Sequence, residues 1–388
     1  MTKLQKIIYI SNARLPSEKA NAYQSMLQCE SFSKVITTEF WFPFRQNSIR
    51  VKNVFEFYGV KNSFVLKQVP SLDSSLLWEL HRKLGFLCQT LSFLFLCAVQ
   101  ILRERTDVVI YTRNTLDMLI VPLLKIIRSN LPIFFEDHDG FLKRHRWIKQ
   151  KLLNHVDGIV VTTSFHSRQL QEGGVPGEKI LIAPNGVKLE RFASLNLPEI
   201  TNDERRVLYV GNLFPWKGVY TLAEATRYLP DQYNIYIIGG SPEAVKPFRT
   251  YLSKHNLDLK VTLIDHVAPV KVADYLKQAN ILVLPNSARH AISELFTSPL
   301  KLFEYMAAKK PIVASDVPAI REVLTHGRNA LLVEPDNPRA LAKGIQIVCE
   351  QPELARRLGE QAFQDVTQYA WEKRTKKIME FIEQRIQA

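Results

Sequence analysis

Cysteine is scarce in this sequence of 388 residues, which contains four. Cys29, Cys88, Cys97 and Cys349 form no CxxC pair and show no regular spacing. This pattern argues against a zinc site and a disulfide framework, and it fits a reducing compartment. The sequence also lacks internal repeats and low-complexity tracts, which argues against a repeat architecture.

Long hydrophobic runs are nearly missing as well. The apolar stretch of "MTKLQKIIYISNA" is only four residues long, so it predicts a first buried strand rather than a signal peptide. The segment from Leu84 to Leu102 approaches the ~20 residues that span a bilayer. However, Gln89, Thr90, Ser92 and Gln100 interrupt it, and arginines follow at once. We therefore predict a buried or interfacial helix rather than a transmembrane one.

The composition is that of a soluble globular protein, with 46% hydrophobic and 23% charged residues, and the length suggests two domains. The formal charge of +13 is unusual and uneven. Residues 1–190 hold 25 Lys and Arg against 16 Asp and Glu, whereas the remainder holds 26 against 22. A basic first half predicts an anionic partner, either a nucleotide, a nucleic acid or an acidic membrane surface. Solubility alone is the alternative explanation.

Short β-branched runs alternate with helical patterns along the chain, which predicts parallel sheets covered on both faces. The predicted strands are "KIIYIS", "VVIYTR", "IFFEDH", "GIVVTT" and "ILIAPN", then "VLYVGN", "NIYIIGG", "VTLIDH", "ILVLPN" and "PIVASD". We predict an α/β protein of two doubly wound domains facing each other across a cleft, where ligands bind at the carboxyl ends of strands. The predicted boundaries are residues 1–186, a linker at 187–204, a second domain at 205–370, and a C-terminal helix at 371–388 that packs back towards the first domain.

The stretch "FTSPLKLFEYMAAKKPIVASD" predicts a helix that starts with Ser298 as N-cap and Pro299 at the first position. Glu304 falls on one stripe of this helix with three apolar residues, Leu300, Phe303 and Ala307. A carboxylate there needs hydrogen-bond donors. Side chains lean towards a helix N-terminus, so Glu304 could reach the ribose of a nucleotide whose diphosphate lies at the helix start. An ion pair with Lys301 is the alternative, but it does not explain the apolar stripe.

"VLYVGNLFPWKGV" places Lys217 at the start of a second helix. A lysine is unfavourable at the positive end of a helix unless an anion binds there, so Lys217 is either a phosphate ligand or a solvated surface residue. Gly239 and Gly240 end the strand of "IYIIGG" and would allow close approach of a ligand, although this signal is weak. Three further polar residues end strands and are interpreted as turn residues: Asp265, His266 and Asn286.

In the first half, "FFEDHDG" gathers Glu136, Asp137, His138 and Asp139 at a strand end, and "YTRN" places Arg113 at another. We predict that His138 lies in the cleft. An alternative is that Asp137 and Asp139 hold a divalent metal. The next stretch, "FLKRHRWIKQKLL", predicts a basic amphipathic helix that either lies on an anionic membrane or packs as an ordinary solvated helix.

Together these stretches resemble the family 4 glycosyltransferases of GT-B fold, a retaining and metal-independent group. The resemblance covers most of the chain and includes "YVGNLFPWKGV", "YLKQANILVLP", "SPLKLFEYMAAKKPIVASDVPAIREVL", "HGRNALLVEPDNP" and "YAWEKRTKK" in order. It implies catalytic roles for His138, which positions the donor sugar, and for Lys217, which grips the diphosphate. It implies a donor site made of Gly211, Asn212, Lys217, Gly239, Val267, Ser298, Pro299, Leu300, Lys301 and Glu304. The acceptor-side candidates are Asn21, Arg113, Glu136 and Asp139.

Three positions depart from the family pattern. Phe296 stands where the first glutamate of an E-x7-E motif is expected, with Glu294 two residues earlier. Asn212 replaces an arginine that follows the strand glycine, so the phosphate site is weaker or uses another basic residue. Lys309 replaces a helix-ending glycine, at a cost of ~1 kcal/mol at most.

The resemblance implies transfer of a sugar from a UDP- or GDP-linked donor to a glycan or lipid-linked acceptor, in surface polysaccharide or glycolipid biosynthesis. It implies no cofactor, no metal and no nucleic acid partner. We expect a cytoplasmic protein, with a peripheral contact on an anionic inner membrane face as a further hypothesis. The alternatives are a nucleotide-sugar epimerase of the same fold and a non-catalytic scaffold that binds anions.

Overall fold

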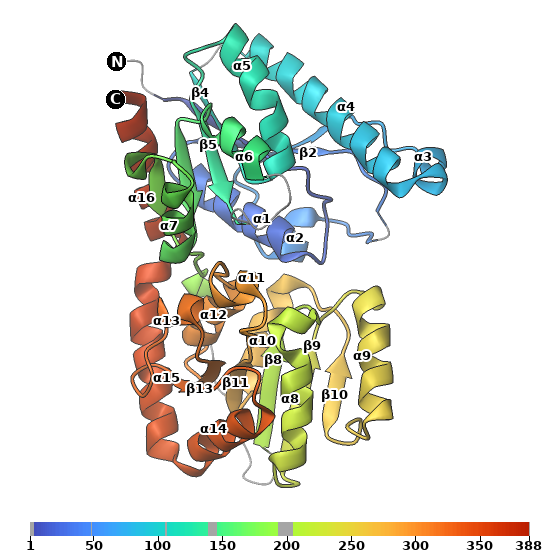
Figure 1. The fold of residues 1–388 in the computed structure, drawn as a ribbon, viewed down its shortest axis with the longest axis vertical. Helices are drawn as coiled ribbons and strands as arrows, with labels where there is room; N and C mark the ends of the chain where they lie inside the picture. The colour runs from blue at the N-terminus through green and yellow to red at the C-terminus, as the bar shows by residue number, and fades with distance from the viewer. Residues whose placement is uncertain (1–3, 48, 105–106, 139–145, 193–204, 388) are drawn as a thin grey trace. The chain divides into compact units, whose positions relative to one another are not determined.

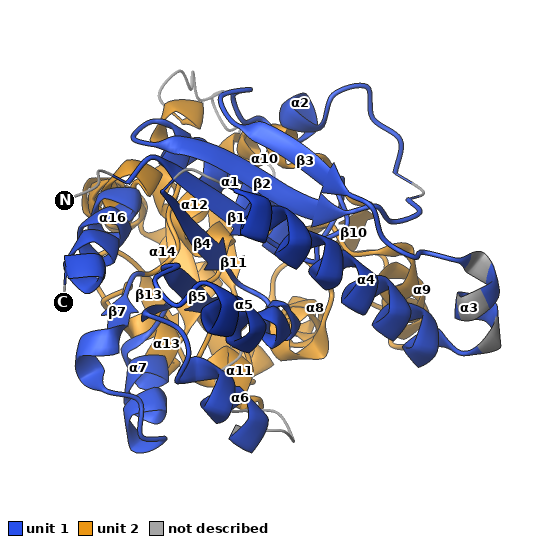
Figure 2. Cartoon of the chain, turned by 90° about the horizontal axis from the view of Figure 1, so that it is seen from above, with its two compact units in different colours: residues 1–183, 374–388 blue, residues 184–373 orange. Residues whose placement is uncertain are grey.

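The computed structural model describes residues 4–47, 49–104, 107–138, 146–192 and 205–387. The chain forms two compact units (Figure 2). Unit 1 contains residues 1–183 and 374–388, and unit 2 contains residues 184–373. Val187 and Phe192, in the stretch that we expected to be a linker, pack in the core of unit 2. Residues 193–204 lie outside the described residues.

Unit 1 is built on a parallel sheet of seven strands in the order β3-β2-β1-β4-β5-β6-β7 (Figure 1). The strands are β1 Lys6–Ile10, β2 Thr37–Pro43, β3 Val65–Val69, β4 Val108–Thr112, β5 Ile133–Asp137, β6 Gly158–Val161 and β7 Ile180–Ile182. Strand β1 pairs in register with both β2 and β4, so that Ile10 lies beside Trp41 and Thr112. The strand order reverses direction between β1 and β4, and this point is the topological switch point of the unit.

Helices cover both faces of this sheet. They are α1 Ala20–Ser33, α2 Val54–Tyr58, α3 Ser75–Leu80, α4 Arg82–Arg103, α5 Val121–Ile127, α6 Arg146–Leu153, α7 Ser164–Glu172 and α16 Trp371–Gln387. Side chains alternate along each strand, so Phe135 packs in one core with α4 and α5, while Phe134 meets Phe381 of α16 on the other face.

Unit 2 repeats this plan with six parallel strands in the order β10-β9-β8-β11-β12-β13. The strands are β8 Arg205–Val210, β9 Tyr233–Ile238, β10 Val261–Ile264, β11 Ile281–Leu284, β12 Ile312–Ser315 and β13 Leu331–Val333. The switch point of this sheet lies between β8 and β11. The two sheets and their helices confirm the α/β prediction of two doubly wound units.

The helices of unit 2 also divide between the two faces of its sheet. They are α8 Val219–Ala225, α9 Pro242–Lys254, α10 Val272–Gln278, α11 Ala291–Glu294, α12 Leu300–Ala307, α13 Pro318–Arg321, α14 Pro338–Glu350 and α15 Pro352–Val366. One core joins the sheet to α10, α12 and α15, and the other joins it to α8, α9 and α14. Short 3₁₀ helices complete the chain: η1 Thr115–Ile120, η2 Gly177–Lys179, η3 Leu189–Arg191, η4 Pro215–Lys217, η5 Thr226–Tyr228, η6 Pro269–Lys271 and η7 Thr367–Tyr369.

Local sequence explains several helix ends. The Asn337 side chain accepts a hydrogen bond from the backbone N–H of Ala340, and Pro338 occupies the first turn of α14. Thr163 caps α7 in the same way through the backbone N–H of His166. Lys309 follows α12 with φ of 57°, a left-handed conformation that glycine adopts more easily.

All ten predicted strands exist, and the structure adds three that we did not predict. Strand β2 ends in proline, β3 contains Lys67 and Gln68 at the sheet edge, and β13 has only three residues, so none is a continuous β-branched run.

The segment from Leu84 to Leu102 lies in α4, the one helix in the described ranges that is long and apolar enough to cross a membrane. Its inner face packs in the core of unit 1 through Phe93, Leu94 and Ile101, which are at most 1% exposed. Removing each of these side chains from the core would cost ~1.5–3 kcal/mol. This helix is therefore an integral part of the unit, as predicted for a buried or interfacial helix.

Candidate functional site

Two strand ends come close together beside the switch point of unit 2. Gly211 follows β8 with φ of 145°, and Gly239 follows β9 with φ of 116°. A Cβ added to Gly239 would lie 2.8 Å from the backbone oxygen of Gly211. Both glycines therefore allow the backbone segments after β8 and β9 to lie close together, and they leave space above the end of β8.

Lys301, in the first turn of α12, places its ammonium group at this strand end. Its Nζ lies 3.6 Å from the centroid of the Tyr209 ring and 3.4 Å from the position of a Cβ built on Gly211. The residue is 8% exposed, and Nζ has no hydrogen-bond partner among the described residues. Burial lowers the pKa of Lys301 well below its usual value, and the positive charge of Lys217 lowers it further.

Helix α12 is fixed over the strand end by two contacts. The Tyr305 hydroxyl accepts a hydrogen bond of 2.8 Å from the backbone N–H of Val210, the last residue of β8. Ser298 Oγ accepts one of 3.0 Å from the backbone N–H of Asn185, and Asn185 Nδ2 donates to the Ser298 carbonyl oxygen. Our prediction of Ser298 as N-cap is therefore wrong. The helix starts at Leu300 with Pro299 in the capping position, because the Ser298 hydroxyl binds a different backbone segment.

Lys217 lies at the end of η4, in the loop that follows β8. Its ammonium group is 5.1 Å from the centroid of the Trp216 ring, and burial lowers the pKa of Lys217 to about 8. The loop is held against the end of β11, because the backbone N–H of Ser287 donates to the Trp216 carbonyl oxygen at 3.1 Å. Gly218 has φ of 74°, and a Cβ there would collide with Pro285.

The two lysines thus bring cations to one strand end. Within the part of unit 2 that the structure describes, no carboxylate raises the pKa of either lysine. Desolvated cations of like charge disfavour each other, and an anion with several oxygens would stabilise both. The arrangement fits a phosphate or diphosphate group.

In unit 1, Glu136 forms the centre of a buried polar network. Its carboxylate is 0% exposed and accepts hydrogen bonds from Gln24 at 2.7 Å, Tyr111 at 2.5 Å and His138 Nε2 at 2.8 Å. The Arg374 guanidinium of α16 lies 2.9 Å from the same carboxylate. Burial alone would raise the pKa of Glu136, but Arg374 and His138 outweigh it and hold the pKa well below its usual range.

This network determines the state of His138. Burial lowers the pKa of His138, and the charge of Arg113 adds to this effect. Because the ionised carboxylate of Glu136 must accept, His138 Nε2 donates its proton and Nδ1 is left as an acceptor. The Glu136 side chain, predicted to lie on the acceptor side, is completely buried and contacts His138.

Asp137 points to the opposite face of the sheet, as the alternation of a strand requires. Its carboxylate lies 2.6 Å from Lys149 Nζ of α6 and 3.1 Å from His166 Nε2 of α7. These partners occupy the carboxylate, and the described residues contain no cluster that could hold a metal ion. The metal alternative thus lacks its first ligand, and Asp139 lies outside the described residues. Lys149 is buried. It therefore does not contribute to the basic face of the amphipathic helix that we predicted from the sequence.

Comparisons with known proteins agree with this geometry. The family "Glycosyl transferases group 1" matches residues 194–365, and "Glycosyltransferase Family 4" matches residues 76–191. The chain belongs to the group 1 glycosyltransferases. Its prediction as a family 4 glycosyltransferase of GT-B fold is confirmed.

Two curated glycosyltransferases resemble part of the chain. The amylovoran biosynthesis glycosyltransferase AmsK of Erwinia amylovora is 26% identical over 225 residues, which cover 56% of this chain and 55% of AmsK. The O-antigen chain mannosyltransferase RfbU of Salmonella typhimurium is 28% identical over 183 residues, which cover 47% of this chain and 48% of RfbU. The chain thus spans about half the length of these relatives.

The structure resembles HepE of Anabaena in complex with UDP and glucose, with a TM-score of 0.77 and 15% identity, over 98% of this chain and 100% of that one. At this identity the likeness shows the fold alone.

Most donor-side candidates of this chain are half-buried at the carboxyl edge of the unit 2 sheet: Gly211, Asn212, Val267, Ser298, Pro299, Leu300 and Glu304. Leu300 and Glu304 form the least buried side of α12, whose other side chains are buried. Glu304 is thus at the edge of the core rather than inside the apolar stripe that we predicted. Phe296, which stands where the family motif has its first glutamate, is 5% exposed, so its side chain is buried. Glu294 is half-buried at the end of α11.

The acceptor-side candidates of unit 1 include Asn21 and Arg113, which are both half-buried. The Arg113 guanidinium donates to the backbone oxygen of Asn21 at 2.9 Å and also to Gln24 Oε1. Sequence reasoning missed Arg374, the ion-pair partner of Glu136. Its stretch "YAWEKRTKK" carried only the family resemblance, and no local pattern shows which of its basic residues is buried.

Proposed function

We propose that this chain is a retaining glycosyltransferase that moves a sugar from a nucleotide-diphosphate donor to a glycan or lipid-linked acceptor of a surface polysaccharide or glycolipid. The observation that carries the proposal is the buried ammonium of Lys301 above Gly211, with Lys217 in the loop that follows the same strand. Lys301 comes from α12 to the place where the family pattern has an arginine and this chain has Asn212. We therefore assign to Lys301 the role of the missing cation.

In this proposal the two ammonium groups stabilise the negative charge that develops on the leaving diphosphate. Because they do so without a metal, the reaction would need no divalent cation, and EDTA would leave the activity unchanged. Glu304, one turn further along α12 than Leu300, would accept hydrogen bonds from the ribose hydroxyls. His138 of unit 1 would position the donor sugar through its Nδ1 acceptor and would not act as a nucleophile.

UDP is the donor nucleotide that we propose, with GDP as the alternative, because HepE was solved with UDP and glucose. The names of AmsK and RfbU, which refer to amylovoran and O-antigen, support a role in surface polysaccharide synthesis. We further propose a cytoplasmic location in which the chain meets a lipid-linked acceptor at the inner membrane face. No feature of the described residues favours an epimerase or a scaffold.

A thermal-shift panel tests the donor site. UDP, GDP and ADP, each free and sugar-linked, are added to the wild type and to Glu304→Ala. A nucleotide at about 100 times its dissociation constant should stabilise the protein by ~2.7 kcal/mol. We expect UDP to shift the wild type and the shift to be lost in the variant. If none of the nucleotides shifts the wild type, the donor assignment is wrong. Sugar transfer that requires an acceptor then separates a transferase from an epimerase, which would convert the donor alone.

A further inference from the structure

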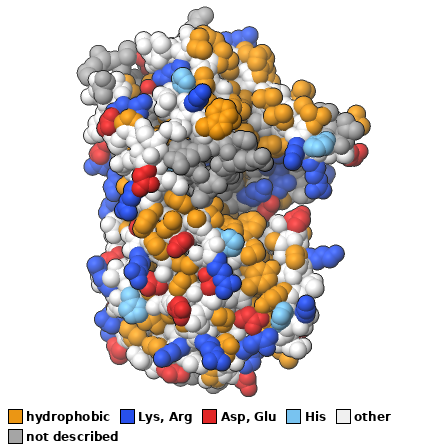
Figure 3. All heavy atoms as spheres, in the orientation of Figure 1, with side chains coloured by type: hydrophobic (Ala, Val, Ile, Leu, Met, Phe, Trp, Pro, Cys, Tyr) orange, Lys and Arg blue, Asp and Glu red, His pale blue; other side chains and the backbone are white. Residues whose placement is uncertain are grey.

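Large apolar side chains are exposed along one side of α4. Leu84, Leu87, Leu91 and Phe95 are between 41% and 64% exposed. Their spacing of three or four residues places them on a single stripe of the helix. Figure 3 shows apolar side chains gathered along α4 and over α5. The opposite side of α4 is packed in the core of unit 1, whereas none of the described residues buries this outer stripe.

A second apolar stripe runs beside the first on η1 and α5. It consists of Leu116, Leu119, Leu123, Ile126 and Ile127, which are between 40% and 81% exposed. Helix α4 packs against both η1 and α5, so the two stripes are neighbours. We call the nine side chains of both stripes the apolar face. A continuous exposed surface of this kind marks an interaction site rather than ordinary surface variation.

The exposed charges carried by helix α4 itself have one sign. Helix α4 contains no carboxylate, and Arg82, Lys83 and Arg103 at its ends are exposed. The carboxylate of η1 belongs to Asp117, which is 1% exposed and thus not part of the surface.

Helix α6, which packs against η1, adds an aromatic and a basic side chain. Trp147 is 61% exposed, and the Lys151 ammonium lies 5.6 Å from the centroid of its ring. Exposed tryptophan next to basic side chains suits the boundary between lipid tails and headgroups.

Unit 2 has no such surface among its described residues. Its large exposed apolar side chains are Phe214, Tyr228, Leu259 and Val270, and each comes from a different loop or 3₁₀ helix. Single exposed apolar residues of this kind need no explanation. The apolar face is therefore a property of unit 1.

We propose that the apolar face docks on the surface of an anionic lipid bilayer, with α4 lying in the plane of the interface. The leucines and Phe95 would enter the boundary of the acyl chains, and the basic residues at the ends of α4 would bind lipid headgroups. The packed inner side of α4 keeps the helix on the surface and prevents it from crossing the bilayer. This docking rests on the proposed function, which supplies the lipid-linked acceptor. Binding to the bilayer itself requires neither donor nor acceptor.

Vesicle sedimentation tests the proposal with the full chain. The vesicles contain phosphatidylcholine alone or equal parts of phosphatidylcholine and phosphatidylglycerol. The test variant is Leu91→Glu with Phe95→Glu. The matched control is Leu259→Glu with Val270→Glu, which adds the same charge to exposed positions of unit 2. A third variant, Arg82→Gln with Lys83→Gln, removes two charges and leaves the apolar face intact. Circular dichroism verifies that each variant is folded.

We expect the wild type and the unit 2 control to sediment with the anionic vesicles. The Leu91 and Phe95 variant should bind at least about tenfold more weakly, and removal of each basic residue should weaken binding about fivefold. The proposal is overturned if the wild type stays in the supernatant or if the Leu91 and Phe95 variant sediments like the wild type. Equal binding to uncharged vesicles would refute the anionic component.

The alternative partner of the apolar face is a second copy of the chain. Light scattering tests for such a dimer. A dimeric wild type and a monomeric Leu91 and Phe95 variant would show that the face is a dimer interface, which overturns membrane docking. The nucleotide panel is independent of these results. A wild type that binds vesicles but shows no thermal shift with UDP would refute the donor site and leave the docking proposal intact.

Discussion

The two units share one sheet plan, yet a buried charged group near the strand ends of each unit has opposite surroundings. In unit 1 the buried carboxylate of Glu136 has four polar partners, including Arg374. In unit 2 the ammonium of Lys301 is buried without a hydrogen-bond partner in the described region. A satisfied buried network fixes a structure, whereas an unsatisfied buried charge favours a ligand of opposite sign. From this difference we expect unit 1 to position side chains and unit 2 to bind an anion.

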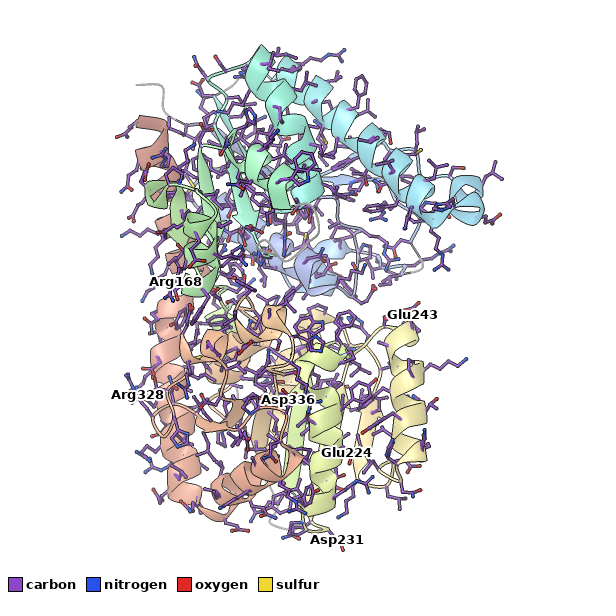
Figure 4. All side chains as sticks on the ribbon, viewed as in Figure 1. Arg168, Glu224, Asp231, Glu243, Arg328 and Asp336 are labelled. Atoms are coloured by element: carbon purple, nitrogen blue, oxygen red, sulfur yellow. The ribbon has the colours of Figure 1, made fainter. Side chains whose placement is uncertain are left out.

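The largest effect should follow from breaking the satisfied network. We expect Arg374→Met to lower the free energy of unfolding by about 3–5 kcal/mol, because it leaves the Glu136 carboxylate buried without its cation. The matched control is Arg328→Met on unit 2. Arg328, labelled in Figure 4, pairs with Asp365 at 2.9 Å, and its side chain is 60% exposed. This control should change stability by at most about 1 kcal/mol. Urea unfolding measures both, and equal losses would refute the contrast.

The unsatisfied site of unit 2 should respond in the opposite way. We expect Lys301→Met to weaken UDP binding by about 10- to 150-fold, the equivalent of one hydrogen bond to a charged group at 1.5–3 kcal/mol. The melting temperature without ligand should not fall, because the variant removes a buried, unpaired charge. Lys310→Met is the control, since Lys310 is 7% exposed in the same unit but outside the proposed site. Calorimetry measures the binding. A destabilised Lys301→Met with normal UDP affinity would make Lys301 a structural residue.

The pH dependence of stability should separate the two switch points. Asp117, near the ends of β1 and β4, is held by Asn114 and Thr112, but burial raises its pKa to about 7. Between pH 4 and 7 the native state therefore holds a proton that the unfolded state has lost, and stability falls as the pH rises. For Lys217 the native pKa of about 8 lies below the unfolded value of 10.5, so stability rises with pH between these values.

Thermal unfolding of the wild type and of Asp117→Asn measures the first of these slopes. The variant should lack the decline and should gain about 1–2 kcal/mol over the wild type between pH 5 and pH 8. This is less than the full shift would give at about 1.4 kcal/mol per pKa unit, because relaxation lets water reach a newly formed carboxylate. Parallel pH curves for the two proteins would show that Asp117 titrates normally.

Local sequence predicted the fold well, because buried parallel strands such as Ile281–Leu284 are continuous apolar runs. It failed at the sheet edge, where Val65–Val69 contains Lys67 and Gln68 and one side of the strand has no neighbour. For the site, sequence placed Glu136 and His138 at the same strand end but did not show that the Glu136 carboxylate is completely buried. Its partner Arg374 comes from the other end of the chain, and no local pattern encodes such a contact.

The smallest effect concerns the end of α12, the helix that carries Lys301. Lys309 has φ of 57° and belongs to a site where glycine has no steric cost. We expect Lys309→Gly to stabilise the protein by up to about 1 kcal/mol, because its ion pair with Glu360 is 3.8 Å long, half exposed and weak. UDP affinity should not change, since the position of α12 depends on Tyr305 and Asn185 rather than on its last residue. Urea unfolding and calorimetry measure the two quantities. A change in UDP affinity would mean that the end of α12 also sets the position of Lys301, so that stability and anion binding in unit 2 are not separable.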